Sequence, residues 1–144
     1  IRDKLVTGVQ TCALPILGMT SENKPISVLV VDDERHGLAV IKDTIQDTGV
    51  ANICAQASSV AEAMEAVEQT QPDCLVLDYH LSDGNALDIV TALHCEDRTI
   101  IISADNSKKE TMARLNIPFI QKPANSHELK SLFLSMIQTK QKKG

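Results

Sequence analysis

One run of residues limits the possible folds of this chain more than any other. The stretch "VLVVDDE", residues 28–34, places four consecutive apolar residues directly before three acids. A run that is apolar on consecutive residues, without the alternation of a half-exposed strand, is typical of a strand covered by helices on both faces. Two further runs of this form end at Asp78 ("CLVLD") and at Ser103 ("TIIIS"). The sequence therefore predicts a parallel sheet with polar side chains at the carboxyl ends of its strands.

From Ile26 onward, strand-like and helix-like segments alternate, which predicts an α/β protein. Five strands are expected, in "ISVLVV", "NICAQA", "DCLVLD", "RTIIIS" and "PFIQ", the last of them short and at an edge. Asn125 and Ser126 are suited to cap a last helix. Its apolar stripe should pack on the sheet and consists of Leu129, Leu132, Phe133, Met136 and Ile137.

Two earlier helices have recognisable ends. A helix at about residues 35–48 is predicted, because apolar residues recur every three or four positions and Gly49 follows at the place of a C-terminal cap. Ser59 and Glu62 have the spacing of a capping box. They predict the start of a second helix, which should end before Pro72.

The composition narrows the classes of function. A chain of 144 residues has the length of one domain with a single core. With 19 acidic against 14 basic residues and three aromatic side chains, we expect no binding to nucleic acid. No apolar run reaches the roughly 18 residues of a membrane span, so we expect a cytoplasmic protein without a membrane segment. The cysteines lack metal or redox spacing and are expected to be buried, reduced thiols: Cys12, Cys54, Cys74 and Cys95.

The two ends of the chain are expected to lie outside the folded domain. Residues 1–18 show neither helical nor strand periodicity. Part of this segment, "VTGVQTCALPI", resembles the translated sequence of a common DNA-sequencing adapter, which makes Met19 the expected native start. An ordinary disordered extension is the alternative. We expect the domain at residues 26–138 and a basic tail at residues 139–144.

Acidic residues stand at the ends of two predicted strands. Asp32 and Asp33 follow the first strand, and Asp78 ends the third. The carboxyl ends of parallel strands share one edge, where ligands bind in open α/β sheets. Carboxylates gathered in a partly buried cleft raise one another's pKa unless a cation neutralises them, and oxygen ligands of this kind suit Mg²⁺. Without Asp78 and a partner cation, Asp33 and Glu34 would fit capping of the next helix better.

Two more strand ends add a hydroxyl and a cation. Ser103 and Ala104 follow the fourth strand, and Lys122 precedes Pro123 after the fifth. Together with a metal ion, these groups would hold the oxygens of a phosphoryl group while a carboxylate attacks as the nucleophile. The set predicts phosphorylation of an aspartate.

At this point the chain resembles a known family. The motifs "VLVVDDE", "CLVLDYHLSDG", "IIISAD" and "FIQKP" occur in the order and approximate spacing of response-regulator receiver domains, over about residues 26–138. The resemblance is to single-domain, chemotaxis-regulator-like signalling proteins. It implies a flavodoxin-like, doubly wound sheet of five parallel strands in the order 2-1-3-4-5, with five helices.

The resemblance implies a role for each acid. Asp78 would be the phosphoacceptor and a catalytic residue. Asp32 and Asp33 would bind Mg²⁺ together with Asp78 and the backbone carbonyl of His80. At positions that vary in the family, the side chains of His80 and Asp105 would tune the lifetime of the phosphorylated state.

The remaining motif residues would bind phosphate and transmit the signal. Ser103 and Lys122 would complete the catalytic set, and both would contact the phosphoryl group together with Ala104. Ser103 and Phe119 would form the switch. Because the segment from Ser103 to Phe119 is shorter than usual, we expect a short fourth helix and transfer no output partner.

The sequence thus predicts a receiver that takes a phosphoryl group from a histidine kinase or a phosphotransfer protein and switches its surface toward an unknown downstream protein. It would act as a monomer or a phosphorylation-dependent dimer, catalysing its own phosphorylation and slow dephosphorylation rather than working as a conventional enzyme. The alternatives are a pseudo-receiver interaction module and the receiver fragment of a longer regulator. A metal-dependent phosphatase would need a second acid two residues after Asp78, where His80 stands.

Overall fold

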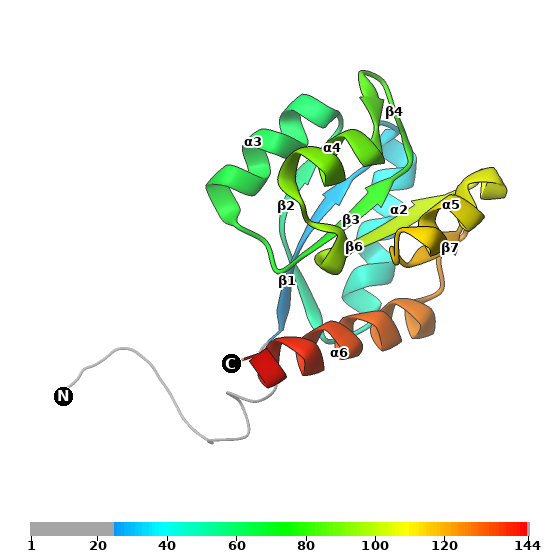
Figure 1. Cartoon of the computed structure of the whole chain (residues 1–144). Helices are drawn as coiled ribbons and strands as arrows, with labels where there is room; N and C mark the ends of the chain where they lie inside the picture. Colours follow the sequence, from blue (N-terminus) through cyan, green and yellow to red (C-terminus); the bar gives the residue numbers. More distant parts are fainter. Residues whose placement is uncertain (1–24, 144) are drawn as a thin grey trace.

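The computed structural model describes residues 25–143, with side chains up to residue 137, so the predicted adapter segment at residues 1–18 lies outside the described residues. A sheet of five parallel strands forms the centre of the molecule, in the order β2-β1-β3-β6-β7 (Figure 1). Counted in chain order this is 2-1-3-4-5, which confirms the expected flavodoxin-like fold. The strands are β1 (Ile26–Val31), β2 (Ala51–Ala57), β3 (Cys74–Asp78), β6 (Thr99–Ser103) and β7 (Phe119–Gln121).

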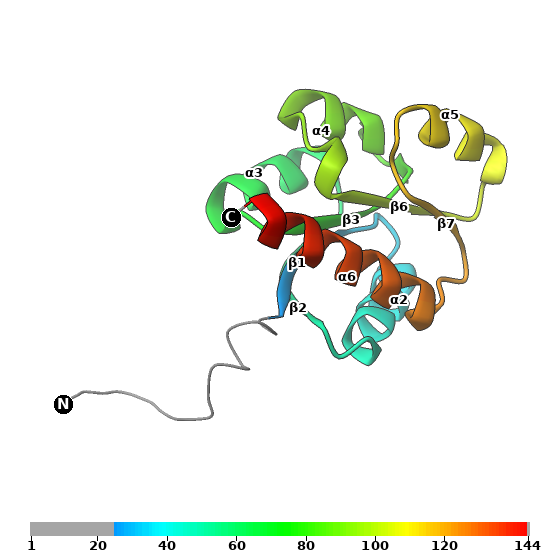
Figure 2. The ribbon, with the colours of Figure 1, turned by 60° about the horizontal axis from the view of Figure 1, so that its bottom comes forward.

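Helices cover both faces of the sheet. Side chains of α2 and α6 belong to the core on one face, and side chains of α3, α4 and α5 belong to the core on the other (Figures 1 and 2). The helices are α2 (Arg35–Asp47), α3 (Val60–Thr70), α4 (Ala86–Leu93), α5 (Lys109–Arg114) and α6 (Ser126–Lys143), with short 3₁₀ turns η2 (Glu96–Arg98) and η3 (Asn106–Lys108). None of the described helices combines the length and apolarity needed to cross a membrane.

The two-sided core explains the apolar runs of the sequence. All five residues of β3 are buried, and the same is true of β6. Along β3, Leu75 and Leu77 face the core under α3 and α4, whereas Cys74 and Val76 face the core under α2 and α6. Successive residues of a strand point to opposite faces, so a strand between two helical layers needs apolar side chains at every position.

The predicted helix ends are largely confirmed. Gly49 has a φ of 73°, the left-handed conformation expected just after α2. The Oγ of Ser59 accepts the backbone N–H of Glu62 at 3.1 Å, as a cap should. A capping box also needs a bond from the backbone N–H of Ser59 to the Glu62 side chain, and this part of the prediction is wrong. Glu62 Oε1 accepts the backbone N–H of Ser58 instead. The Oδ1 of Asn125 accepts the N–H of His127 at 2.7 Å and caps α6.

The fourth helix along the chain, labelled α5, is short, as the short segment before Phe119 predicted. The helix α5 has six residues and is followed by Asn116 with a φ of 60°. Asparagine tolerates this left-handed conformation better than most residues, so it can stand where the family usually has glycine. At the other end of the chain, α6 continues to Lys143, past the expected domain boundary at residue 138.

Two features differ from the predictions or were not predicted. The loop after β3 forms a small antiparallel hairpin of β4 (His80–Leu81) and β5 (Gly84–Asn85). Cys74 and Cys95 are buried, but Cys54 is exposed, so the prediction that it is a buried thiol is wrong. Cys54 lies on β2, an edge strand whose central residues alternate between exposed and half-buried positions. Cys12 lies outside the described residues.

Candidate functional site

Three aspartates meet at the carboxyl ends of β1 and β3. Val31 pairs with Leu77 in the parallel ladder, so Asp32 and Asp78, the next residue on each strand, lie side by side. Asp32 is 1% exposed and Asp78 is 9% exposed, whereas Asp33 is exposed. One carboxylate oxygen from each of the three lies within 4.8 Å of the others. The structure therefore brings together the three side chains predicted to bind a metal ion.

Lys122 supplies positive charge to this group from the last strand of the sheet. Its Nζ lies 3.1 Å from Asp32 Oδ2 and 3.7 Å from Asp78 Oδ2. Its backbone N–H donates to the carbonyl of Ser103 at 2.9 Å, which fixes the start of the loop after β7 against the end of β6. The lysine is thus held where it faces the predicted nucleophile.

The electrostatic balance of the site leaves excess negative charge. Burial raises the pKa of Asp78 from its ordinary value of 3.8 to about 6, with Asp32 and Asp33 adding to the rise and Lys122 opposing it. Burial lowers the pKa of Lys122, but the hydrogen bond to Asp32 and the charges of Asp78, Asp32 and Glu34 outweigh it, so the net shift is upward. One ammonium group lies beside a cluster of three carboxylates and offsets only part of their charge, which favours binding of a further cation.

The backbone after Asp32 holds its carboxylate in place, and a glycine that was not predicted from the sequence leaves room for it. Its Oδ1 accepts the backbone N–H of Glu34 at 2.9 Å. Glu34 precedes α2 without a side-chain capping bond, so the alternative in which these acids simply cap the helix is not supported. A Cβ atom on Gly37 would lie 2.7 Å from Asp32 Oδ2. Gly37 thus allows the first turn of α2 to approach the cluster of three aspartates.

The signal for Gly37 was present in the sequence. A glycine inside a helical pattern costs about 1 kcal/mol relative to alanine, and such a residue usually has a packing or functional reason. What could not be seen was the contact itself, because it joins a helix to a strand end through tertiary packing.

Ser103 and Phe119 occupy neighbouring strands beside the site. Ser103 is buried at the end of β6, and its Oγ accepts the backbone N–H of Asp105 at 3.2 Å. Ala104 follows it and is exposed. Phe119, half-buried, pairs with Ile101 in the ladder and packs against the core under α3 and α4. The predicted switch residues therefore lie in the adjacent strands that end near Asp78 and Lys122.

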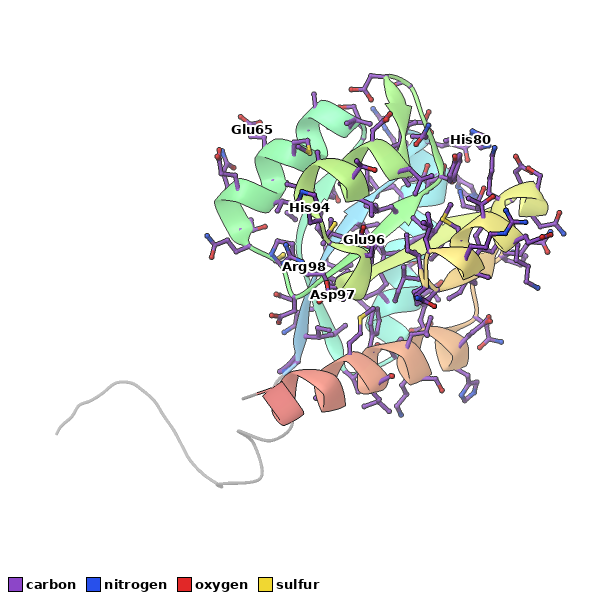
Figure 3. The ribbon with its side chains drawn as sticks, in the orientation of Figure 1. Glu65, His80, His94, Glu96, Asp97 and Arg98 are labelled. Carbon is purple, nitrogen blue, oxygen red and sulfur yellow. The ribbon has the colours of Figure 1, made fainter. Side chains whose placement is uncertain are left out.

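His80 and Asp105 join the two loops beside the site. The Nε2 of His80 lies 3.0 Å from Asp105 Oδ2 and so links the hairpin after β3 to the loop after β6. Figure 3 shows the position of His80. Hydrogen bonds from Ser107 and His80 hold the pKa of Asp105 well below its usual range. Both side chains are substantially exposed, so the pair contributes little to overall stability. The structure brings together the two residues predicted to tune lifetime.

The site residues fit a divalent cation of the magnesium type. The donor set is three carboxylates, the hard oxygen ligands that Mg²⁺ prefers, and Asp78 carries a raised pKa that a nearby cation would reverse. Asp33 is exposed, which leaves one side of the group open to water. Within residues 25–143, this is the one cluster of three such side chains close enough to share an ion.

Comparison with known proteins assigns the class. The family model described as "Response regulator receiver domain" matches residues 28–133, and the chain belongs to this family. It is 32% identical over 120 residues to a protein-glutamate methylesterase/protein-glutamine glutaminase of Pyrococcus horikoshii, a match that covers 78% of this chain and 31% of that protein. It is 37% identical over 68 residues to the sensory transduction protein LytT of Bacillus cereus, covering 47% and 28%.

Solved structures agree on the fold. A response regulator receiver domain protein of Clostridium thermocellum has a TM-score of 0.70 at 20% identity and covers 83% of this chain and 99% of its own. A CheY-like receiver domain protein of Methanospirillum hungatei has a TM-score of 0.70 at 18% identity, covering 84% and 100%. The chain spans about a third of the length of the curated relatives it matches first. It is a receiver domain of the response-regulator type.

Gly37→Ala should weaken Mg²⁺ binding without unfolding the domain. The added methyl group favours the helix by up to about 1 kcal/mol, but it cannot coexist with the present position of Asp32 Oδ2. Mutation of the residues that hold a metal ligand in position typically lowers the affinity for the metal by about tenfold or more. Isothermal titration with Mg²⁺ measures this, with His36→Ala, an exposed neighbour on α2, as the control. Unchanged affinity in Gly37→Ala would show that Asp32 is not a ligand in this position.

Asp78→Asn should stabilise the metal-free domain at neutral pH. The folded state binds the Asp78 proton more tightly than the unfolded state, so this carboxylate lowers stability progressively as the pH rises from about 4 to about 6. Because the group is partly solvated, we expect a gain on the order of 1 kcal/mol near pH 7 and none below pH 4. Urea unfolding in the presence of EDTA measures it, with exposed Asp43→Asn as the control. A gain of equal size at both pH values would contradict the assignment.

Proposed function

We propose that this receiver domain accepts a phosphoryl group on the Asp78 carboxylate from a histidine kinase or a histidine-containing phosphotransfer protein. The observation that carries the proposal is the convergence of Asp78 with two further carboxylates and with Lys122 at one edge of the sheet. Three carboxylates beside one lysine are more acids than an ion pair needs. They suit a divalent cation, and the cation and the lysine together can offset the charge of a phosphoryl group.

The chemistry assigns a task to each residue. An oxygen of the ionised Asp78 carboxylate attacks the phosphorus in line, the bond from phosphorus to the donor's imidazole nitrogen breaks, and the imidazole keeps the electron pair. With a pKa of about 6 before any cation binds, Asp78 is mainly ionised at neutral pH. Lys122, which faces Asp78 Oδ2 at 3.7 Å, offsets the charge that gathers on the phosphoryl oxygens.

Asp32, Asp33 and Asp78 would hold Mg²⁺, with the carbonyl of His80 as a further ligand. When bound, Mg²⁺ supplies charge neutralisation and a fixed contact for one phosphoryl oxygen. The Ser103 hydroxyl and the backbone of Ala104 would contact the other oxygens.

Phosphorylation would then act as a local electrostatic switch. Ser103 lies buried at the end of β6, and the half-buried Phe119 lies on the neighbouring strand. Movement of the Ser103 hydroxyl toward the phosphoryl group opens space for the Phe119 ring, which alters the surface near β7. We propose that a downstream protein reads this change in the cytoplasm, without contact between this domain and nucleic acid. The domain would act as a monomer or a phosphorylation-dependent dimer.

Two alternative functions are supported to different extents. A pseudo-receiver module would be expected to lack an acid or the lysine, and Asp32, Asp78 and Lys122 are all present and in contact range. The receiver portion of a longer regulator is a candidate that one observation favours, since the first curated relatives are about three times longer than their match to this chain. In both one-domain and multidomain forms, the proposed chemistry at Asp78 is the same.

Incubation with Mg²⁺ and acetyl phosphate should add one phosphoryl group per chain. Intact mass spectrometry measures the addition, and treatment with hydroxylamine should remove it because an acyl phosphate is labile to this nucleophile. Asp78→Asn should abolish the addition while the domain stays folded, and exposed Asp43→Asn should not. Wild-type phosphorylation of Asp78→Asn at a single site would show that another residue is the acceptor.

The pair of His80 and Asp105 should set how long the phosphorylated state lasts. We propose that the imidazole covers part of the approach to Asp78, so His80→Ala should speed decay by admitting water. Asp105 can orient that water through its carboxylate, so Asp105→Ala should slow decay. Each change is expected to be on the order of tenfold, about 1.4 kcal/mol in the barrier.

Because the two side chains contact each other at 3.0 Å, the effects should not add in the double variant. Decay of the phosphorylated protein at fixed Mg²⁺ measures all three, with Asn106→Ala, an exposed neighbour, as the control. Rates equal to wild type in both single variants would exclude both side chains from the path of the water.

A further inference from the structure

A shallow groove lies between α3 and α4, on a different part of the molecule from the acidic site. It has a volume of about 550 Å³ and is lined by Met64, Glu65, Val67 and Glu68 from α3 and by Leu93 at the end of α4. We call these five residues the α3–α4 groove. Its size is in the range of pockets that hold a ligand or several side chains of a partner.

The groove has an apolar floor and an acidic rim. Val67 is buried, and Met64 and Leu93 are half-buried and pack against the core under α3 and α4. Glu65 and Glu68 are exposed and, three residues apart, are neighbours on the surface of α3. Among the side chains that the structure describes, neither of these glutamates forms an ion pair.

The two helices of the groove carry charge of one sign. α3 contains Glu62, Glu65 and Glu68, α4 contains Asp88, and neither helix contains Lys or Arg. Figure 3 shows Glu65 on α3, and Glu96 and Asp97 in the segment after α4. Arg98, in the segment after α4, donates a guanidinium N–H to the carbonyl of Pro72 at 2.9 Å and is thereby fixed to the loop after α3. Neither α3 nor α4 contributes a Lys or Arg that would offset the glutamates of the rim.

We propose that the α3–α4 groove binds a basic amphipathic segment of a partner protein. Apolar side chains of the segment would lie on Met64, Val67 and Leu93, and its Lys or Arg side chains would pair with Glu65 and Glu68. A short helix with apolar residues on one face and basic residues beside them has this form, and helices commonly dock in such grooves. Phosphate-bearing partners are disfavoured, because nucleic acids and anionic membranes are repelled by an acidic surface.

A second copy of this chain is a weaker candidate for the same groove. Residues 98–144 contain nine Lys and Arg against three Asp and Glu, so this part of the sequence carries the complementary charge. Contact between the groove of one copy and basic residues of the next is head-to-tail, and such contacts form rings only if the rotation closes and open filaments otherwise. A separate partner meets the charge requirement without this constraint, and the proposal does not depend on phosphorylation of Asp78.

The test uses a fluorescein-labelled peptide with Leu at helical spacing and Lys at the flanking positions. Fluorescence anisotropy with the full chain should show binding that weakens as salt is added. Glu65→Gln with Glu68→Gln should weaken binding on the order of tenfold, and Met64→Gln should weaken it separately. Glu110→Gln with Glu128→Gln removes the same charge from α5 and α6, outside the groove lining, and should leave binding nearly unchanged. A peptide with Glu in place of Lys should not bind.

Several results would overturn the proposal. Equal loss in both pairs of glutamate variants would show general charge attraction rather than a site at the groove. Displacement of the probe by a synthetic peptide of residues 1–24 would assign the groove to a segment of this chain. Salt-dependent self-association in sedimentation, abolished by the Glu65 and Glu68 changes, would assign it to a second copy. Absence of any binding by folded protein, checked by circular dichroism, would reject the groove as a docking site.

Discussion

The ion pair between Asp32 and Lys122 is the interaction on which the site depends. It joins residues 90 positions apart, at the ends of β1 and β7, and its carboxylate is fully buried. Two strands, β3 and β6, lie between these partners in the sheet. The pair can therefore form only when the parallel sheet is assembled in its full order. A buried charge left without its partner costs about 3–5 kcal/mol, so the site and the fold stabilise each other.

The same pair leaves Asp78, the proposed nucleophile, incompletely neutralised. Lys122 is closer to Asp32 than to Asp78, by 3.1 Å against 3.7 Å. The raised pKa of Asp78 is the measure of this imbalance, since burial and two neighbouring carboxylates outweigh the lysine. The free energy lost in the metal-free state is recovered when positive charge enters the cluster. Strain of this kind at a functional site is tolerated because the buried core elsewhere offsets it.

The sequence was sufficient for the fold where its signals were long and repeated. Consecutive apolar residues in β3 and β6, and acids at the strand ends, predicted both the two-sided sheet and the residues gathered at its edge. Short or tertiary features were not predictable in this way. The hairpin of β4 and β5 has two residues in each strand, too few for any periodicity. The role of Gly37 arises from a close approach between a helix and a strand end, which joins segments by tertiary packing. Glu62 accepts the N–H of Ser58 rather than that of Ser59, and the sequence spacing does not distinguish these two donors.

The loop after Asp78 connects the acidic site physically to the α3–α4 groove. Asp83, in the turn between β4 and β5, accepts the backbone N–H groups of Val60 at 2.7 Å and Ala61 at 3.1 Å, at the start of α3. The hairpin that carries His80 is thus anchored to the helix that carries Glu65 and Glu68. A displacement of this hairpin by a phosphoryl group on Asp78 would change the capping of α3. Because binding free energies are linked reciprocally, a partner segment that prefers one position of α3 would then shift phosphorylation to the same extent that phosphorylation shifts its binding.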